Sequence, residues 1–247
     1  KSMLCGTNMT DIKISNRSAI LRLLHEAGAM SRKQIAARLK LTPATITVII
    51  NELMNESILV EGNSVPNAGA VGRREVMVEI SREKYVALGL ALSQGLVKFT
   101  VVNLHGEIIH EETFKLPEIL TPEYFAETIG RQIQLKIASY GYSENFIIGI
   151  GITVCGVVDF ANGIILDSDG IWEEKNVPIV KMFRKQFSFP VIAANNVRSY
   201  ANAYAFLQHD SQLQNMLFIR NEATMGVSLI LNGQFYGGDR NLAAGIA

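Results

Sequence analysis

The sequence predicts an α/β protein of two domains, a small one over residues 10–80 and a larger one over residues 84–247. A length of 247 residues is sufficient for both. The first 80 residues show helical spacing of apolar side chains and carry ten Lys or Arg against seven Asp or Glu, a net charge of +3. From Tyr85 onward, patterns typical of strands and helices alternate, and the net charge of the remainder is −3.

The first domain begins with two short predicted helices. The first has Ser15 or Asn16 as its N-cap, repeats apolar residues at i, i+3, i+4 and i+7, and ends at Gly28. Ser31-x-x-Gln34 has the form of a capping box, in which each side chain bonds the other residue's backbone N–H, and it predicts a second helix.

A third helix is predicted over residues 43–54, with Thr42 as its N-cap and Pro43 at its first position. Its apolar residues again occupy one side. Strands over residues 58–61 and 75–80 follow. Three helices and a pair of strands are typical of a winged helix-turn-helix domain, whose recognition helix enters the major groove of DNA.

Seven cations and a single acid, Glu26, lie between residues 13 and 40, which is the charge pattern expected of a partner for double-stranded DNA. On the third helix, Asn51 suits an adenine edge and the methyl groups suit thymine. The alternative is a protein-interaction module with a solvated basic face. The candidate DNA-binding residues are Arg32, Thr42, Ala44, Thr45, Thr47, Val48, Asn51, Arg73 and Arg74.

The second domain is predicted to open with an antiparallel strand meander and to continue as alternating helices and strands. Asn162-Gly163 and Asn232-Gly233 predict hairpin turns. The predicted strands are 86–92, 97–103, 108–113, 146–154, 191–194, 216–220, 227–231 and 234–236, and the predicted helices are 122–140, 179–187 and 197–207.

Composition excludes several classes of protein. Cys5 and Cys155 are far apart and have no Cys or His neighbours at metal-ligand spacing, so we expect neither a disulfide framework nor a metal site in this chain. No apolar run reaches the length of a membrane-spanning helix, and the N-terminus lacks a secretory signal pattern. These observations predict a cytoplasmic protein. Trp172 could stack on a ligand, although an anchor for its loop is the simpler interpretation.

Several short motifs follow one another along the chain in a characteristic order. They are Asn16 with Ile20-Leu21, Ser31-Arg32, Leu41-Thr42 through Leu53, Gly72-Arg73, Gly149-x-Gly151-x-x-x-x-Gly156-x-Val158-Asp159, and Asn195 ahead of a helix. In this order the sequence resembles the ROK family, which contains sugar-responsive repressors, uncharacterised reading frames and sugar kinases. The first motifs resemble only the repressor branch.

The resemblance implies a winged helix-turn-helix followed by a two-lobed actin-like or ribonuclease-H-like ATPase-type domain with a sugar cleft. It implies operator DNA and a sugar or sugar-phosphate effector as partners. A homodimer is expected because two winged domains would match paired half-sites about one helical turn apart, and no membrane partner is expected because no apolar run could span one. Ala244-Gly245-Ile246-Ala247 resembles the start of the family's sugar-binding segment, so the second lobe is expected to be incomplete here. The family's zinc site would lie beyond Ala247, and no cofactor is expected in this chain.

Three departures from the kinase pattern predict that the domain is not an enzyme. Ala91 stands where kinases carry a phosphate-loop carboxylate, and Glu222 stands in the second phosphate loop. Asn196 stands where kinases carry the Asp that accepts the proton of the sugar hydroxyl, and an amide cannot act as that base.

Sugar binding needs hydrogen-bonding groups rather than a titrating base, so Gly156, Asn195 and Asn196 are the candidate ligand-binding residues. The alternative is that both asparagines only cap the following helix. The sequence therefore predicts a DNA-binding repressor that responds to a sugar. Two other functions remain open: a bifunctional sugar kinase with a DNA-binding arm, and a regulator that senses a partner protein.

Overall fold

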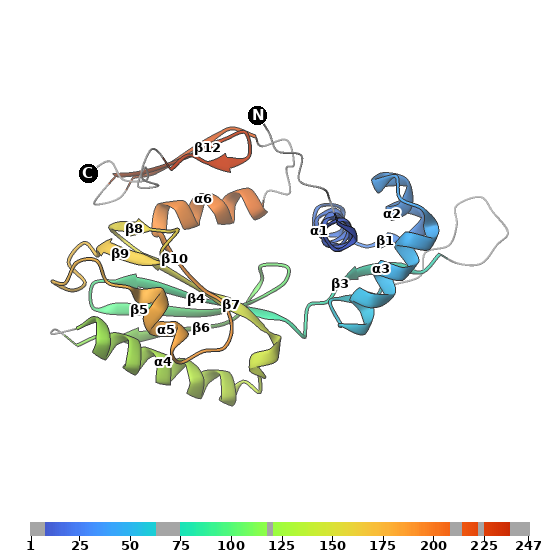
Figure 1. Ribbon diagram of the computed structural model, residues 1–247. Helices are drawn as coiled ribbons and strands as arrows, with labels where there is room; N and C mark the ends of the chain where they lie inside the picture. Colours follow the sequence, from blue (N-terminus) through green and yellow to red (C-terminus); the bar gives the residue numbers. More distant parts are fainter. Residues whose placement is uncertain (1–7, 63–74, 118–120, 208–213, 222–224, 238–247) are drawn as a thin grey trace. The chain divides into compact units, whose positions relative to one another are not determined.

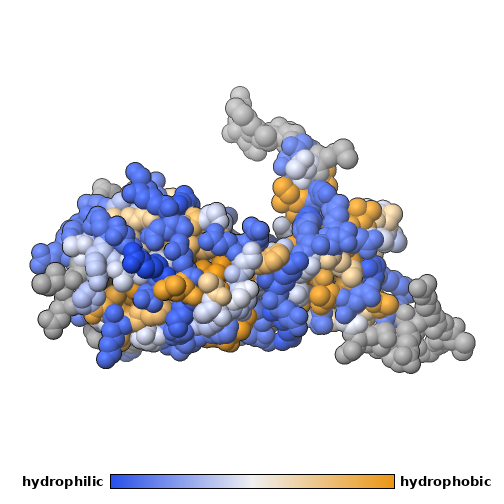
Figure 2. All heavy atoms as spheres, turned by 90° about the horizontal axis from the view of Figure 1, so that it is seen from below, coloured by the Kyte–Doolittle hydropathy of each residue, from blue (hydrophilic) through white to orange (hydrophobic). Residues whose placement is uncertain are grey.

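The computed structural model describes residues 8–62, 75–117, 121–207, 214–221 and 225–237, and the chain divides into two compact units, 1–84 and 85–247 (Figure 1). On the face drawn in Figure 2, hydrophilic residues predominate among the described ones, with hydrophobic side chains between them. Within the described ranges, no helix has the length and apolar character needed to cross a bilayer.

The first unit contains the three predicted helices, α1 (Met9–Ala27), α2 (Arg32–Leu39) and α3 (Pro43–Asn55). The predicted start of α1 at Ser15 or Asn16 is wrong. Asn8 is the N-cap, and it forms a capping box with Asp11. The added turns expose Ile12 and Ile14, so they lack the buried apolar stripe on which the prediction relied.

Three short strands complete the first unit: β1 (Met30–Ser31), β2 (Leu59–Glu61) and β3 (Met77–Ile80). They form an antiparallel sheet in the order β1-β3-β2. The prediction of β2 and β3 is confirmed, although the strands are one and two residues shorter than predicted. Strand β1 was missed because two residues show no periodicity. The unit is a winged helix-turn-helix.

A mixed five-stranded sheet forms the centre of the second unit. Its order is β10-β7-β4-β5-β6; β4, β5 and β6 form the predicted antiparallel meander, and β7 runs parallel to both β4 and β10. The strands are β4 (Val86–Ser93), β5 (Leu96–Asn103), β6 (Ile108–Lys115), β7 (Ile147–Val154) and β10 (Val191–Asn195).

Helices α4 (Pro122–Ser139) and α5 (Ile179–Arg184) lie on one side of this sheet (Figure 1). Their core includes the fully buried rings of Phe99, Phe125 and Phe183. A short 3₁₀ turn, η1 (Glu144–Phe146), precedes β7. Helix α5 ends three residues before its predicted end, because the backbone N–H groups of residues 185–187 form tight turns onto residues 182 and 183.

On the other side of the sheet lie α6 (Asn196–Leu207) and a three-stranded sheet (Figure 1). A separate hairpin, not predicted as strands although its Asn162-Gly163 turn was, links the main sheet to α5. The three-stranded sheet consists of β11 (Met216–Asn221), β12 (Met225–Leu231) and β13 (Gln234–Phe235), and the hairpin of β8 (Val157–Asp159) and β9 (Ile164–Asp167).

Candidate DNA interface and effector site

Helix α3 has one buried and one open side, as its sequence predicts. The buried side packs Ile46, Ile49, Ile50 and Leu53 into the core of the first unit. Val48 on the other side is 57% exposed, an apolar side chain left in solvent. The predicted contact residues Thr42, Ala44, Thr47, Val48 and Asn51 are exposed, and Thr45 is half-buried.

Hydrogen bonds fix several of these side chains. The Thr42 hydroxyl accepts from the Thr45 backbone N–H at 3.2 Å, and the Thr47 hydroxyl donates to the Pro43 carbonyl at 2.8 Å. These threonine hydroxyls therefore form hydrogen bonds within the helix itself. Asn51 is different, because its Oδ1 accepts from an N–H of Arg32 on α2 at 3.4 Å.

The structure thus brings together Arg32 and Asn51, which are far apart in sequence. The carbonyl oxygen of an amide has two lone pairs, so Asn51 Oδ1 can accept from Arg32 and from a base at the same time. No other described group is bonded to the Asn51 Nδ2 donor. The arrangement leaves a donor and an acceptor available on one exposed amide, which is what readout of adenine requires.

In the folded structure, acidic side chains from outside the basic segment neutralise part of its charge. Lys13 Nζ lies 2.8 Å from Glu52 Oε1, and Arg17 donates two hydrogen bonds to Glu56, at 2.9 and 2.5 Å. Glu52 belongs to α3 and Glu56 is its C-cap, so counting charges along residues 13–40 omitted both acids. The cations that are exposed and form no ion pair with another described residue are Arg22, Lys33, Arg38 and Lys40.

A groove of about 550 Å³ separates α1 from α3. It takes in three of the predicted contact residues, while Thr47 and Asn51 do not line it. The groove is lined by Ile12, Lys13, Asn16, Ala44, Thr45, Val48, Ile49 and Glu52. Arg73 and Arg74 of the predicted wing contact lie outside the described residues.

The second unit gathers its candidate site residues where three parallel strands end. Leu92 of β4, Val154 of β7 and Asn195 of β10 are in register, so the segments that follow them leave the sheet at one edge. Ligands of open α/β sheets bind at the carboxyl ends of such strands. Gly156 lies two residues after the end of β7, and Asn196 directly follows β10 at this edge.

Gly156, Asn195 and Asn196 are indeed brought together. Asn195 Nδ2 donates to the Gly156 carbonyl at 2.6 Å, and its Oδ1 accepts from the Val197 backbone N–H at 2.8 Å. Asn196 Nδ2 donates to Cys155 Sγ at 2.9 Å. Asn195 therefore both caps α6 and ties it to the Gly156 turn. Each amide NH₂ retains a second N–H that could serve a ligand.

The backbone of Gly156 lies close to the backbone of residues 167 and 169, and it can do so only because Gly156 has no side chain. Its φ is +109°, and an added Cβ would lie 2.2 Å from the Asp167 carbonyl oxygen and 3.1 Å from the Asp169 nitrogen. Gly156 thus allows the turn after β7 to pack against the end of β9.

The structure also shows what occupies the kinase phosphate-loop positions. Ala91 is exposed on β4, and a two-residue turn, Gln94-Gly95, joins β4 to β5. Gln94 Nε2 donates to the Asp169 carbonyl at 3.2 Å, so this side chain is engaged with the protein itself. Residues 222–224, the second predicted phosphate-loop position, lie outside the described part of the chain.

The other singled-out residue, Trp172, has a structural role. Trp172 is 7% exposed and its ring packs 5.6 Å from that of Phe125, which confirms the loop anchor rather than a sugar platform. Where the structure is described, no three His, Cys, Asp or Glu side chains are grouped as metal ligands would be.

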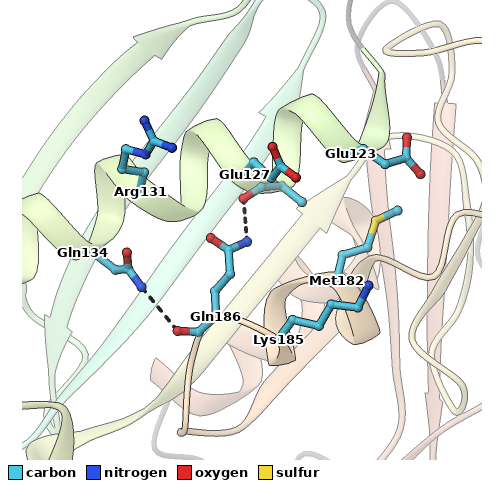
Figure 3. Close-up of a pocket in the computed structure, with 8 residues that line it drawn as sticks. Glu123, Glu127, Arg131, Gln134, Met182, Lys185 and Gln186 are labelled. Atoms are coloured by element: carbon cyan, nitrogen blue, oxygen red, sulfur yellow. Dashed lines mark hydrogen bonds between the residues drawn. The ribbon is translucent and has the colours of Figure 1, made fainter.

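A second groove, of about 460 Å³, lies between α4 and α5 (Figure 3). Gln186 crosses it. Its Nε2 donates to the backbone carbonyl of Ala126 at 2.8 Å, and its backbone carbonyl accepts from Gln134 Nε2 at 3.3 Å. A Cβ at Gly130 would lie 2.1 Å from Gln186 Oε1, so these residues pack two helices together. This groove is on the opposite side of the main sheet from α6 (Figure 1).

The two units define a class of protein, a winged helix-turn-helix joined to an actin-like domain of the sugar-kinase type. The sequence profile of the ROK family matches residues 88–246, and a profile described as winged helix-turn-helix DNA-binding matches residues 15–60. The chain therefore belongs to the ROK family, as its motifs predicted.

Curated relatives match both units in one alignment. The chain is 26% identical over 229 residues to the DNA-binding transcriptional dual regulator NagC of Escherichia coli K12, covering 93% of this chain and 55% of NagC. It is 22% identical over 231 residues to the xylose repressor of Bacillus subtilis strain 168, covering 94% of this chain and 59% of that repressor. The chain thus spans a little over half the length of these relatives.

Solved structures show the same fold. A ROK family transcriptional regulator described as a homologue of the E. coli MLC protein superimposes with a TM-score of 0.77 and 22% identity, covering 95% of this chain and 58% of that one. A ROK glucokinase from Streptomyces griseus, solved with glucose and AMPPNP, gives a TM-score of 0.52 at 19% identity, covering 65% of this chain and 49% of that one.

Proposed function

We propose that this protein is a transcriptional regulator, a repressor, that binds operator DNA through its winged helix-turn-helix and responds to a sugar through its second unit. One observation carries the proposal. An exposed readout face on α3 occurs in the same chain as a kinase-type domain whose base position holds an amide, Asn196. The names of two relatives that match both units, a DNA-binding transcriptional dual regulator and a xylose repressor, support it.

The mechanism is a coupling between two binding sites. A sugar bound by Asn195 and Asn196 at the start of α6 favours one arrangement of the second unit over others. In a homodimer, that change alters the spacing of two recognition helices, which must match half-sites about one helical turn, or a multiple of it, apart. Operator affinity then falls when the sugar binds.

The experiment is a selection of double-stranded DNA from a random library on the purified protein, followed by titration of the selected DNA with sugars. We expect a two-fold symmetric site and a sugar that weakens binding. A protein that selects no sequence would contradict the DNA-binding assignment, and a sugar-insensitive complex would contradict the effector assignment.

We further propose that the domain does not phosphorylate its sugar. Ala91 supplies no carboxylate for metal and phosphate, and Gln94 is bonded to the Asp169 carbonyl. Asn196 can hydrogen-bond a hydroxyl but cannot take its proton. The structural similarity to sugar kinases concerns the fold alone.

A further inference from the structure

Arg198 has an environment unlike that of any other described arginine. It lies in the first turn of α6, two residues after Asn196, and its guanidinium carbon is 4.2 Å from the ring centroid of Phe160 and 5.0 Å from that of Phe235. Phe160 directly follows β8 and Phe235 belongs to β13. Two rings from different elements therefore hold this guanidinium by cation–π contacts.

The charge of Arg198 is partly buried without a counter-charge. Burial lowers its pKa from the ordinary value, although an arginine remains protonated at neutral pH. Arg17 shows the contrary case, since its bonds to Glu56 raise its pKa. Among the described residues, no carboxylate pairs with the Arg198 guanidinium and no acceptor is hydrogen-bonded to it. The desolvation cost is therefore not offset by a pairing within the described protein.

The position of Arg198 joins it to the candidate effector site. Its backbone N–H donates to Asn195 Oδ1 at 3.4 Å, in the same capping turn that Asn195 ties to Gly156. Residues 155–160 thus contact the start of α6 three times, through Cys155 with Asn196, Gly156 with Asn195, and Phe160 with Arg198. The positive end of the α6 dipole adds to the charge of the guanidinium here.

Stacking occupies the faces of a guanidinium and leaves the N–H donors at its edge, which suit a planar or tetrahedral oxyanion held by two bonds. We propose that Arg198 binds an anionic group of the effector, so that the effector is an acidic sugar, either a phosphate ester or a sugar carboxylate. This inference rests on the proposed effector function. It adds a specificity-determining residue that separates acidic sugars from their neutral parents.

The test measures binding of four probes to the protein by calorimetry: neutral hexoses and amino sugars, their 6-phosphates, the corresponding sugar acids, and inorganic phosphate. We expect an acidic sugar to bind about 10- to 100-fold more tightly than its neutral parent, the range of one or two charge-assisted hydrogen bonds. The two acidic arms decide between phosphate and carboxylate.

Variants then assign this preference to the residue. Arg198→Met keeps an unbranched apolar stem between the rings and removes the charge, so the acidic preference should disappear while the neutral parent still binds. Arg198→Lys keeps the charge but loses the planar fork, and should retain part of the preference. Arg131→Met, at an exposed arginine of α4, is the matched control and should bind like the parent protein. Circular dichroism checks that each variant is folded.

The outcomes separate this inference from the function on which it rests. Equal binding of neutral and acidic sugars, or an acidic preference that survives in folded Arg198→Met, overturns the inference and leaves a sugar-responsive regulator intact. Binding of inorganic phosphate as tight as that of any sugar phosphate also overturns it, because the site would then be a general anion site. Failure of every sugar to bind overturns the effector function itself. If Arg198→Met does not fold, Arg198→Lys decides, since an unchanged preference there contradicts a bidentate role.

Discussion

At the scale of single residues, the amide of Asn51 is the side chain of α3 best placed to distinguish one base from another. It is exposed, and Arg32 donates to its Oδ1. Threonine hydroxyls nearby are engaged with the helix backbone. Specificity through hydrogen bonds should therefore concentrate on Asn51, whereas the methyl groups of the helix add apolar contacts.

We predict that Asn51→Ala relaxes the preference at one base pair by about 1–3 kcal/mol, because a bidentate amide contact is lost. Fluorescence anisotropy against a set of single-base operator variants measures this change. Asn55→Ala, at the exposed end of the same helix, is the control and should leave the preference unchanged. If the Asn51 variant discriminates as the parent does, α3 does not read bases through this residue.

Gly156→Ala should destabilise the second unit by about 2–4 kcal/mol, since it combines an unfavourable positive φ with a clash against the Asp167 carbonyl. Trp172 is the sole tryptophan, so its fluorescence during urea unfolding reports on this unit. Gly141→Ala has a φ of +77° but open space around the added Cβ, and should cost only about 1–2 kcal/mol. Equal losses in the two variants would show that crowding at Gly156 is not significant.

At the scale of secondary-structure elements, ion pairs connect α1 to α3 and to its C-cap, Glu56. Arg17 is bonded to Glu56, and Lys13 to Glu52. These pairs are partly exposed, so each contributes about 1 kcal/mol or less. They nevertheless connect the start of α1 to the recognition helix.

The hydrogen bond from Arg17 lowers the pKa of the Glu56 carboxyl below its ordinary value of 4.5. A carboxyl whose pKa is lower in the folded state adds stability above the unfolded pKa and loses it as the pH falls through the folded value. Glu56→Gln should therefore weaken the first unit at pH 7, and its effect should shrink as the pH falls below 4.5 and through the lowered pKa of the folded state. Thermal melting followed by circular dichroism, with Trp172 fluorescence tracking the second unit, measures this. Glu61→Gln on β2 is the control, and identical behaviour of the two variants would contradict the role of the pair.

The wing is the second element for which the sequence makes a prediction. Replacing Arg73 and Arg74 with Ala should weaken binding to all DNA sequences alike, because contacts to phosphate carry no base information. The slope of log affinity against log salt should lose up to about two units, roughly 0.9 for each phosphate contact. A parental slope in the double variant would mean that these arginines do not approach DNA.

At the scale of the whole molecule, coupling between the effector and operator sites must be reciprocal. If a sugar weakens operator binding by a given factor, saturating operator DNA must weaken sugar binding by the same factor. Calorimetric titration of the sugar with and without operator DNA measures the factor by which DNA changes the sugar affinity. Random DNA that the protein does not select is the control. A sugar affinity that is the same with and without operator DNA would show that the sugar does not act on DNA binding.

The other whole-molecule prediction is that no sugar phosphate forms. The missing base alone is typically worth about 10²–10⁴ in rate, and the altered phosphate loop removes more. Incubation with ATP, magnesium and a panel of hexoses and amino sugars, followed by direct detection of sugar phosphate, tests this. Enzyme-dependent product at about 1 per second would show that the base position has been misassigned.

The sequence by itself determined the secondary structure and the family. Caps such as Ser31 with Gln34, the apolar stripe of α3 and the meander after Tyr85 are local patterns, and local hydrogen bonds and burial are sufficient to produce them. The same local patterns did not predict where α1 begins, because its first turns have no buried apolar stripe. They also failed where an element was too short to show a period, as in β1.

Only the tertiary structure decided which side chains meet. Glu52 and Glu56 neutralise cations 39 positions away, Arg32 reaches Asn51, and Asn195 binds the Gly156 turn. The position of Arg198 between two rings is of the same kind, since Phe160 and Phe235 lie on elements far from it along the chain. Periodicity and capping depend on neighbours within one turn, whereas these contacts depend on how the chain returns to the same place in space.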